Sequence, residues 1–255
     1  RGISAPLMVV KGDGSFMTGK SAEEKPIETI LSGPAASVIG TMHLAELKDA
    51  TVIDIGGTTS DIASVKDGCV DIREDGAIVG AWRTHVMAAD IYTHGIGGDS
   101  KLRIDEAGNL TFGPDKTTPI SLLLNDEKSD DKILKKVKQV IGEDSNAEGG
   151  FTPTDLAHVI GIYDKWNNKA ADAAIDVLCD RLECDRETCI VRVENAFFNT
   201  IKKALDDSGK MKDNVPIIAI GAPSHAWMPQ IAAQYGFTSF VPENADVANA
   251  IGAAV

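Results

Sequence analysis

The sequence has 255 residues, of which 43% are hydrophobic and 25% are charged, and its formal net charge at pH 7 is −13. This length suffices for one large or two modest domains, and the negative charge excludes a surface that attracts nucleic acid or an anionic membrane. No apolar run approaches the roughly 18 to 20 residues that span a bilayer, and no signal segment opens the chain, so we expect a cytoplasmic protein.

The beginning of the chain predicts a hairpin and then a helix. Residues 5–10 and 15–17 are typical of two short strands joined by a glycine-containing turn. After a polar connection, a helix rich in small residues is expected to begin at Ser32 as its N-cap, with Pro34 in its first turn. Because the first residue is Arg1 and strand character follows almost at once, we expect the chain to begin inside a larger protein.

The stretch TVIDIGGTTSD, residues 51–61, combines an apolar strand with a tight polar turn. Glycines let backbone N–H groups approach a phosphate, hydroxyls add donors, and carboxylates bind a divalent cation and its water. The alternative is a plain hairpin turn with capping aspartates. The residues that the first interpretation would use are Asp54, Gly56, Gly57, Thr58, Thr59 and Asp61.

A second glycine-rich loop, DIYTHGIGGDS, occupies residues 90–100 after several short predicted strands. Gly97 and Gly98 form another turn that suits a phosphate. Asp90, Tyr92 and His94 lie at alternating positions of an extended segment and therefore share a face, and Asp90 and His94 there are the candidate ligands of a transition metal. The alternative is that His94 is an ordinary loop histidine.

The remainder of the chain predicts a hairpin, a polar insertion, three helices and a final α/β segment. The helices are expected at 154–166, 168–182 and 185–207, after a hairpin at 102–112 and a polar stretch at 114–150 with a short helix at 131–141. Strands are expected at 215–220 and 239–241, and a closing helix of small residues at 246–255.

The loop that follows the strand at 215–220 lies where ligands bind in open α/β sheets, at the carboxyl end of a strand. Its residues are Gly221, Ala222, Pro223 and Ser224. An ordinary strand-to-helix connection is the alternative.

Taken together, these segments resemble the actin, hexokinase and heat-shock ATPase superfamily. The motifs ETILSGPAASVIG, DIGGTTSDIA, THGIGGDS and VANAIGAAV, in that order, resemble the hydantoinase A/oxoprolinase family, whose members open cyclic amides with ATP and whose relatives are carboxylase subunits for ketones. The resemblance implies an α/β, ribonuclease-H-like lobe with a mixed five-stranded sheet flanked by helices and a helical insertion.

The resemblance also implies a domain division and partners. The superfamily's first phosphate hairpin has no counterpart here, so residues 1–31 are expected to be the tail of a first lobe. Residues 32–112 and 213–255 would form the second, nucleotide-binding lobe, and 113–212 a linker and helical insertion. We expect partners in the missing first lobe and a second, B-type subunit or domain, an isolated chain without activity, and a homo-oligomer as an option.

The implied cofactors are ATP and Mg²⁺. Asp54 and Asp61 would arrange Mg²⁺, the turns at 56–59 and 97–98 would hold the β- and γ-phosphates, and 221–224 would lie against the nucleoside. The implied reaction is phosphorylation of an amide oxygen followed by attack of water. Alternatives are a ketone carboxylase subunit, a sugar or acid kinase or actin-like regulatory ATPase, and a non-catalytic binding module. ETILSGPAAS favours the amidohydrolase family over the kinases.

Overall fold

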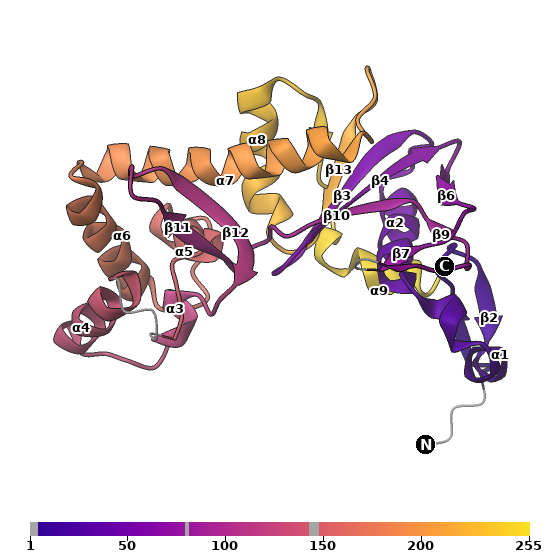
Figure 1. The fold of residues 1–255 in the computed structure, drawn as a ribbon, viewed down its shortest axis with the longest axis horizontal. Helices are drawn as coiled ribbons and strands as arrows, with labels where there is room; N and C mark the ends of the chain where they lie inside the picture. The colour runs from indigo at the N-terminus through magenta and orange to yellow at the C-terminus, as the bar shows by residue number, and fades with distance from the viewer. Residues whose placement is uncertain (1–4, 80–81, 143–147) are drawn as a thin grey trace. The chain divides into compact units, whose positions relative to one another are not determined.

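The computed structural model describes residues 5–79, 82–142 and 148–255, and their contacts divide the chain into two compact units (Figure 1). Unit 1 contains the chain up to Ile55, Asp61–Thr93 and Ser208–Val255. Unit 2 contains Gly56–Ser60 and His94–Asp207. In the described ranges, no helix has both the length and the apolar character needed to cross a membrane.

Unit 1 is built around a mixed, six-stranded sheet with the order β10-β4-β3-β13-β14, in which β5 pairs with β4. The strand β13 runs parallel to β3 and to β14, whereas β5 is antiparallel to β4. The mixed sheet confirms the prediction, with the short β5 added to the five strands expected. The strands are β3 (Ala50–Ile55), β4 (Ser60–Lys66), β5 (Cys69–Val70), β10 (Ile91–His94), β13 (Ile217–Ile220) and β14 (Ser239–Phe240).

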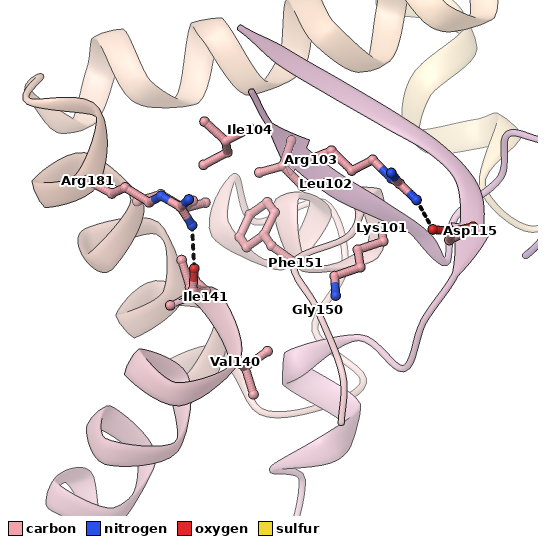
Figure 2. A pocket seen from close by; sticks show the side chains of 12 residues that line it. Lys101, Leu102, Arg103, Ile104, Asp115, Val140, Ile141, Gly150, Phe151 and Arg181 are labelled. Carbon is pink, nitrogen blue, oxygen red and sulfur yellow. Dashed lines mark hydrogen bonds and ion pairs between the residues drawn. The ribbon is translucent and has the colours of Figure 1, made fainter. Parts of the chain in front are cut away.

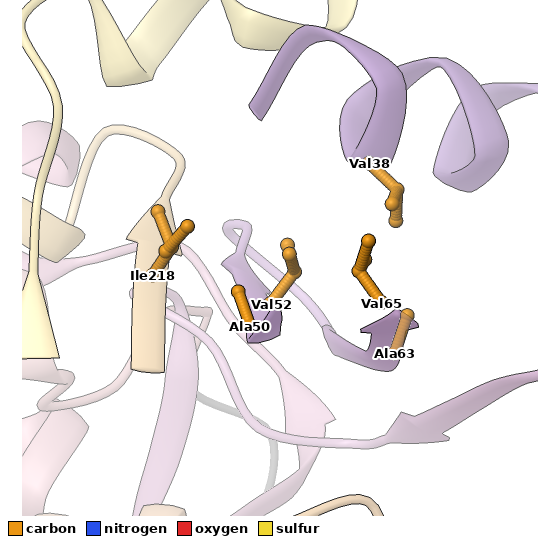
Figure 3. Close-up of a cluster of buried hydrophobic side chains, with 6 residues drawn as sticks. All are labelled: Val38, Ala50, Val52, Ala63, Val65 and Ile218. Atoms are coloured by element: carbon orange, nitrogen blue, oxygen red, sulfur yellow. The ribbon is translucent and has the colours of Figure 1, made fainter. Parts of the chain in front are cut away.

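The neighbouring strands β3 and β13 are buried along almost their whole length. Continuous apolar runs of this kind are typical of parallel strands that are covered on both faces. Helix α2 (Ser32–Ala45) directs Val38 onto a cluster formed by the sheet residues Ala50, Val52, Ala63, Val65 and Ile218 (Figure 3). Burial of these side chains fixes the register of β3, whose carboxyl end carries Asp54.

Helix α2 packs closely against α9 (Ala248–Gly252), as the small residues of both segments predict. A Cβ on Gly40 would collide with the carbonyl of Ala248, and a Cβ on Gly252 would collide with the carbonyl of Ala36. The two backbones therefore meet at positions that only glycine can occupy.

Two details of these helices differ from the prediction. The N-cap of α2 is Leu31, in the left-handed region with φ 61°, and Ser32 is the first helical residue. The Ala35 N–H donates to the Leu31 carbonyl. The helix therefore begins one residue earlier than it would with Ser32 as its N-cap. The closing helix is a 3₁₀ turn, η2 (Ala245–Val247), followed by the short α9.

The rest of unit 1 consists of short elements. The predicted hairpin is present as β1 (Met8–Val10) and β2 (Phe16–Thr18). The connection expected to be merely polar forms α1 (Gly19–Glu24) and η1 (Pro26–Thr29). Two small antiparallel pairs follow, β6 (Ile72–Arg73) with β9 (Ala88–Ala89) and β7 (Ile78–Val79) with β8 (Trp82–Arg83).

Unit 2 combines one hairpin with helices. The hairpin is β11 (Ser100–Ile104) and β12 (Leu110–Lys116), and Phe112 on β12 contacts Phe197 edge to face at 5.8 Å between ring centroids. The helices are α3 (Ile120–Leu123), α4 (Asp130–Ile141), α5 (Pro153–Val159), α6 (Asn168–Leu182) and α7 (Arg186–Ser208).

The contacts place the hairpin β11–β12 with the helices, because Leu102 donates its N–H to the Phe151 carbonyl and Phe112 packs on α7. The contact boundary at Thr93 therefore lies earlier in the chain than the predicted boundary at 112. The assignment of the segments to ATPase lobes stays a prediction.

Candidate functional site

The turn between β3 and β4 is the tight polar loop that the glycine pair predicts. Gly56 donates its N–H to the Thr59 carbonyl at 2.9 Å. Within the described chain, the backbone N–H groups of Gly57, Thr58 and Thr59 donate to no protein acceptor, and Gly57 and Thr58 are exposed. Consecutive N–H groups in a turn are able to bind an anion together. We call residues 56–59 the first turn.

The second glycine turn, residues 97–98, packs directly against the first turn, inside unit 2, and is called the second turn below. The N–H of Gly98 donates to the Gly56 carbonyl at 3.0 Å, and the N–H of Asp99 donates to the Gly57 carbonyl at 2.7 Å. A Cβ on Gly97 would lie 2.5 Å from the Gly56 oxygen and 2.6 Å from the Gly57 carbonyl carbon. Gly97 therefore allows an approach that a larger residue would prevent.

The N–H groups of Gly97 and Gly98 in the second turn both already have protein acceptors. Besides the bond from Gly98, the Gly97 N–H donates to Ser100 Oγ at 2.9 Å. Nearby, Ser60 Oγ donates to the Ile96 carbonyl at 2.8 Å. Contact of Gly97 and Gly98 with phosphate stays a prediction. The geometry favours a different role for them, in which they stabilise the first turn while the N–H groups of residues 57–59 remain available.

Asp99 is a candidate site residue that was not among those predicted. A Cβ on Gly57 would lie 2.8 Å from Asp99 Oδ2, so this carboxylate lies against the first turn. Burial raises the pKa of Asp99 above its usual value, although Lys116, with its Nζ 3.6 Å from Oδ2, opposes the shift. Asp99 follows directly after the predicted glycine pair, which was the available signal, whereas its partner on β12 could be located only by the register of the hairpin.

In unit 1, Asp54 and Asp61 lie near enough to each other for their charges to interact. Burial raises the pKa of Asp54, and a hydrogen bond with Ser37 opposes the shift. Burial likewise raises the pKa of Asp61; a 2.6 Å hydrogen bond from Thr93 Oγ1 lowers it, and the charge of Asp54 raises it further. Two mostly buried carboxylates that repel each other are a suitable place for a cation.

The loop after β13 lies against Asp54, as the parallel pairing of Ile220 with Asp54 requires. Gly221 has φ +89°, and a Cβ on it would lie 2.9 Å from Asp54 Oδ1 and collide with the Ile55 carbonyl. The predicted loop residues Gly221, Ala222 and Pro223 are thus at the carboxyl end of the sheet beside a candidate carboxylate. Ser224 is different: it is fully buried, and its Oγ donates to the Ile220 carbonyl, so its hydroxyl is used within the loop.

Asp90 forms ion pairs with two cationic side chains of unit 1. Arg73 contacts Asp90 Oδ1 and Lys210 contacts Oδ2, so both carboxylate oxygens are paired with cations. A group of three or more His, Cys, Asp or Glu side chains arranged for a metal is absent from the residues that the structure describes. A transition metal at Asp90 and His94 stays a prediction, and the ion pairs assign Asp90 to stabilisation of unit 1.

A cavity of about 430 Å³ in unit 2 is lined by none of the predicted site residues (Figure 2). Two of its cationic side chains have structural roles. Arg103 points toward Asp115 and pairs with it, and Arg181 donates from Nη1 to the Ile141 carbonyl at 2.6 Å, at the end of α4. Because these contacts account for both guanidinium groups, we assign no ligand to the cavity.

Comparisons with known proteins identify the family of the chain. The family model for hydantoinase/oxoprolinase matches residues 1–255, whereas no curated protein matches the sequence significantly. A nucleotide-free structure of acetone carboxylase, from work on ATP-dependent acetone carboxylation, is 22% identical with a TM-score of 0.75, and the match covers 99% of this chain and 35% of that one. The ATP-dependent caprolactamase from Pseudomonas jessenii is 18% identical with a TM-score of 0.68, covering 98% and 36%.

These structural similarities confirm the predicted fold, that of the actin-like ATPases. The chain spans about a third of the length of both similar structures. Together with the match of the family model over the sequence, the motifs lead to one conclusion: the chain belongs to the hydantoinase/oxoprolinase family.

Proposed function

We propose that the chain is the nucleotide-binding part of an ATP-dependent enzyme that opens cyclic amides. The proposal rests on the first turn: within the described residues, three of its consecutive backbone N–H groups have no protein acceptor, and its Gly56 and Gly57 carbonyls accept hydrogen bonds from Gly98 and Asp99. A turn whose carbonyls are fixed by hydrogen bonds and whose N–H groups have no acceptor is preorganised for an anion and needs little rearrangement on binding. Membership of the hydantoinase/oxoprolinase family makes a nucleotide phosphate the expected anion.

The residues of the chain fit the triphosphate and its cation. The N–H groups of Gly57, Thr58 and Thr59 would donate to the β- and γ-phosphate oxygens. Asp54 precedes the first turn by two residues and Asp61 follows it by two, so both carboxylates are available to Mg²⁺, which is usually bound by one or two carboxylates together with phosphates. Their raised pKa values also suit a cation, because its binding relieves their mutual repulsion.

The loop beside Asp54 would hold the nucleoside. Gly221 brings backbone close to Asp54, and Ala222 is exposed. We leave Ser224 out of the proposed contacts because it is buried. When bound, ATP supplies the phosphoryl group that activates the amide oxygen; the residues of this chain orient that group and neutralise its charge.

The chemistry at the amide itself is assigned to other parts of the protein. In this proposal, Asp54 and Asp61 serve the cation, Asp99 lies against the first turn, and none of the three attacks the amide carbon. We propose that a first lobe and a B-type subunit or domain supply the amide site, which agrees with the share of about a third that the chain covers in similar structures.

The test is ATP hydrolysis by the whole protein with a panel of cyclic amides, including 5-oxoproline, hydantoins and caprolactam. We expect phosphate release that depends on one of these amides and matches formation of the ring-opened acid mole for mole. Asp54→Asn should abolish both, whereas Asp115→Asn, which removes a carboxylate paired only with Arg103, should leave both unchanged. Absence of hydrolysis with every amide contradicts the proposal.

Ketone carboxylation is the second candidate function, and it is supported by the similarity to acetone carboxylase. The same assay distinguishes the two activities. A carboxylase requires a ketone together with bicarbonate and forms a carbon–carbon bond, whereas an amidohydrolase needs neither. Hydrolysis that depends on acetone and bicarbonate, with the β-keto acid as product, would select the second candidate.

A further inference from the structure

The second turn is itself held in place by a threonine of α5. The carbonyl of Gly98 accepts two hydrogen bonds from Thr154, one from its backbone N–H at 3.0 Å and one from its Oγ1 at 2.8 Å. The same residue, Gly98, donates its N–H to Gly56 in the first turn. Thr154 and the first turn therefore bond to opposite sides of one residue.

The N-terminus of α5 is a rigid support for this contact. Asp155 is fully buried, and its carboxylate accepts from the N–H groups of Ile120, Ser121 and Thr152 at 3.1, 2.8 and 3.0 Å. Thr152 in turn accepts from the Asp155 N–H, which completes a capping box. Residues on both sides of Thr154 are thus fixed by hydrogen bonds that do not involve Gly98.

His158 fixes the carbonyl side of Thr154. Its Nδ1 lies 2.8 Å from the Thr154 carbonyl, and its Nε2 accepts from the Trp166 N–H at 3.2 Å. Because the Trp166 N–H donates to Nε2, Nδ1 is the ring nitrogen that donates to the Thr154 carbonyl. The ring is stacked on Trp166 and contacts Tyr163 edge to face.

We propose that Thr154 is a positioning residue for phosphate binding. It fixes the Gly98 carbonyl, which holds the second turn against the first turn and so keeps the three unpaired N–H groups aimed at one anion. Thr154 touches neither nucleotide nor metal in this scheme; it acts through Gly98, and His158 keeps its backbone in place. This inference rests on the proposed function, because it assigns a role in binding ATP.

Two substitutions separate the hydroxyl from the side-chain shape. Thr154→Val keeps the size and the branched shape but removes the Oγ1 donor, whereas Thr154→Ser keeps the donor. Thr200→Val is the matched control, since Thr200 Oγ1 bonds only to the Ala196 carbonyl within α7. All three proteins would be compared with wild type after thermal unfolding has shown that they are folded.

The first readout needs no nucleotide: hydrogen exchange of the Gly98 and Asp99 amides, which donate to the first turn. Thr154→Val should accelerate their exchange about threefold to tenfold, the factor that corresponds to one lost neutral hydrogen bond. Thr154→Ser and Thr200→Val should leave the exchange within about twofold of wild type. Unchanged exchange in Thr154→Val overturns the inference.

The second readout is calorimetric titration with Mg·ATP. We expect Kd to rise about threefold to tenfold in Thr154→Val and to return near the wild-type value in Thr154→Ser. If wild type binds Mg·ATP and Thr154→Val binds equally well, the positioning role is wrong and the proposed function stands. If wild type binds no Mg·ATP, the proposed function fails, and the positioning role fails with it.

Discussion

Replacement of Gly97 by alanine tests the packing of the two turns. The added Cβ would lie 2.5 to 2.7 Å from three backbone atoms of Gly56 and Gly57, and backbone cannot rotate aside as a side chain can. The turns must separate, which breaks the bonds from Gly98 to Gly56 and from Asp99 to Gly57, now 3.0 and 2.7 Å long. At about 0.5 to 1.5 kcal/mol for each bond, Gly97→Ala should lower the free energy of unfolding by about 1 to 3 kcal/mol.

The assay is urea unfolding followed by circular dichroism, together with Mg·ATP titration of the folded variant. Gly33→Ala is the control, because a Cβ on Gly33 meets no atom within 4 Å and alanine favours a helix. The control should be at least as stable as wild type. A Gly97→Ala protein with wild-type stability and wild-type affinity would refute the reasoning, since it would show that the turns do not depend on close contact.

Two further predictions concern unit 1. Gly40→Ala should lower the free energy of unfolding by more than about 1 kcal/mol, because its Cβ collides with the Ala248 carbonyl; denaturant unfolding measures this, and a neutral result contradicts the α2–α9 packing. Burial alone would raise the pKa of Asp90, but hydrogen bonds from Lys210 and Arg73 lower it, so its stabilising contribution is present above the unfolded pKa of about 3.9 and is lost as pH falls through the lowered folded value. Asp90→Asn should therefore destabilise the protein clearly at pH 7 and progressively less as the pH is lowered below about 3.9, and a destabilisation that does not change with pH contradicts the pairing.

The long helices could be predicted because their signal is local. The helix predicted at 168–182 is α6, with the same bounds, and α4 and α7 differ by one residue at their ends. Apolar periodicity of 3.6 residues extends over four or more turns in α7, and tertiary contacts reinforce it. The predicted helix at 154–166 ends instead at Val159, because the residues after it form a loop in which the Trp166 N–H donates to Nε2 of the buried His158.

The composition of the candidate site was only partly predictable. A glycine pair after an apolar strand marks a turn, and the motifs 56–59, 97–98 and 221–223 all form turns or loops of the kind expected. What the sequence could not show is that Gly98 and Asp99 donate their N–H groups to the carbonyls of the first turn. That fact depends on contacts between residues about 40 positions apart, for which a single sequence carries no local pattern.

The roles of Thr154 and Asp99 were likewise hidden. Thr154 lies in a segment whose composition predicts only a helix start, and its contact with Gly98 spans 56 positions. The ion pair of Asp99 with Lys116 depends on the antiparallel register of β11 and β12, in which Lys116 pairs with Ser100. Register follows from which face of a hairpin is buried, and that is settled by packing on α7 rather than by the strands themselves.

Binding of the ATP triphosphate by the first turn can be measured by calorimetric titration of Mg·ATP into wild type and Gly57→Val. A Cβ at position 57 would lie 2.8 Å from Asp99 Oδ2, so the larger valine should disturb this exposed turn, whereas Gly33→Ala, whose Cβ meets no atom within 4 Å, serves as the control. We expect saturable binding to wild type and the control, and an affinity at least about tenfold lower for Gly57→Val. Equal affinity in wild type and Gly57→Val, or no binding to folded wild type, would contradict it.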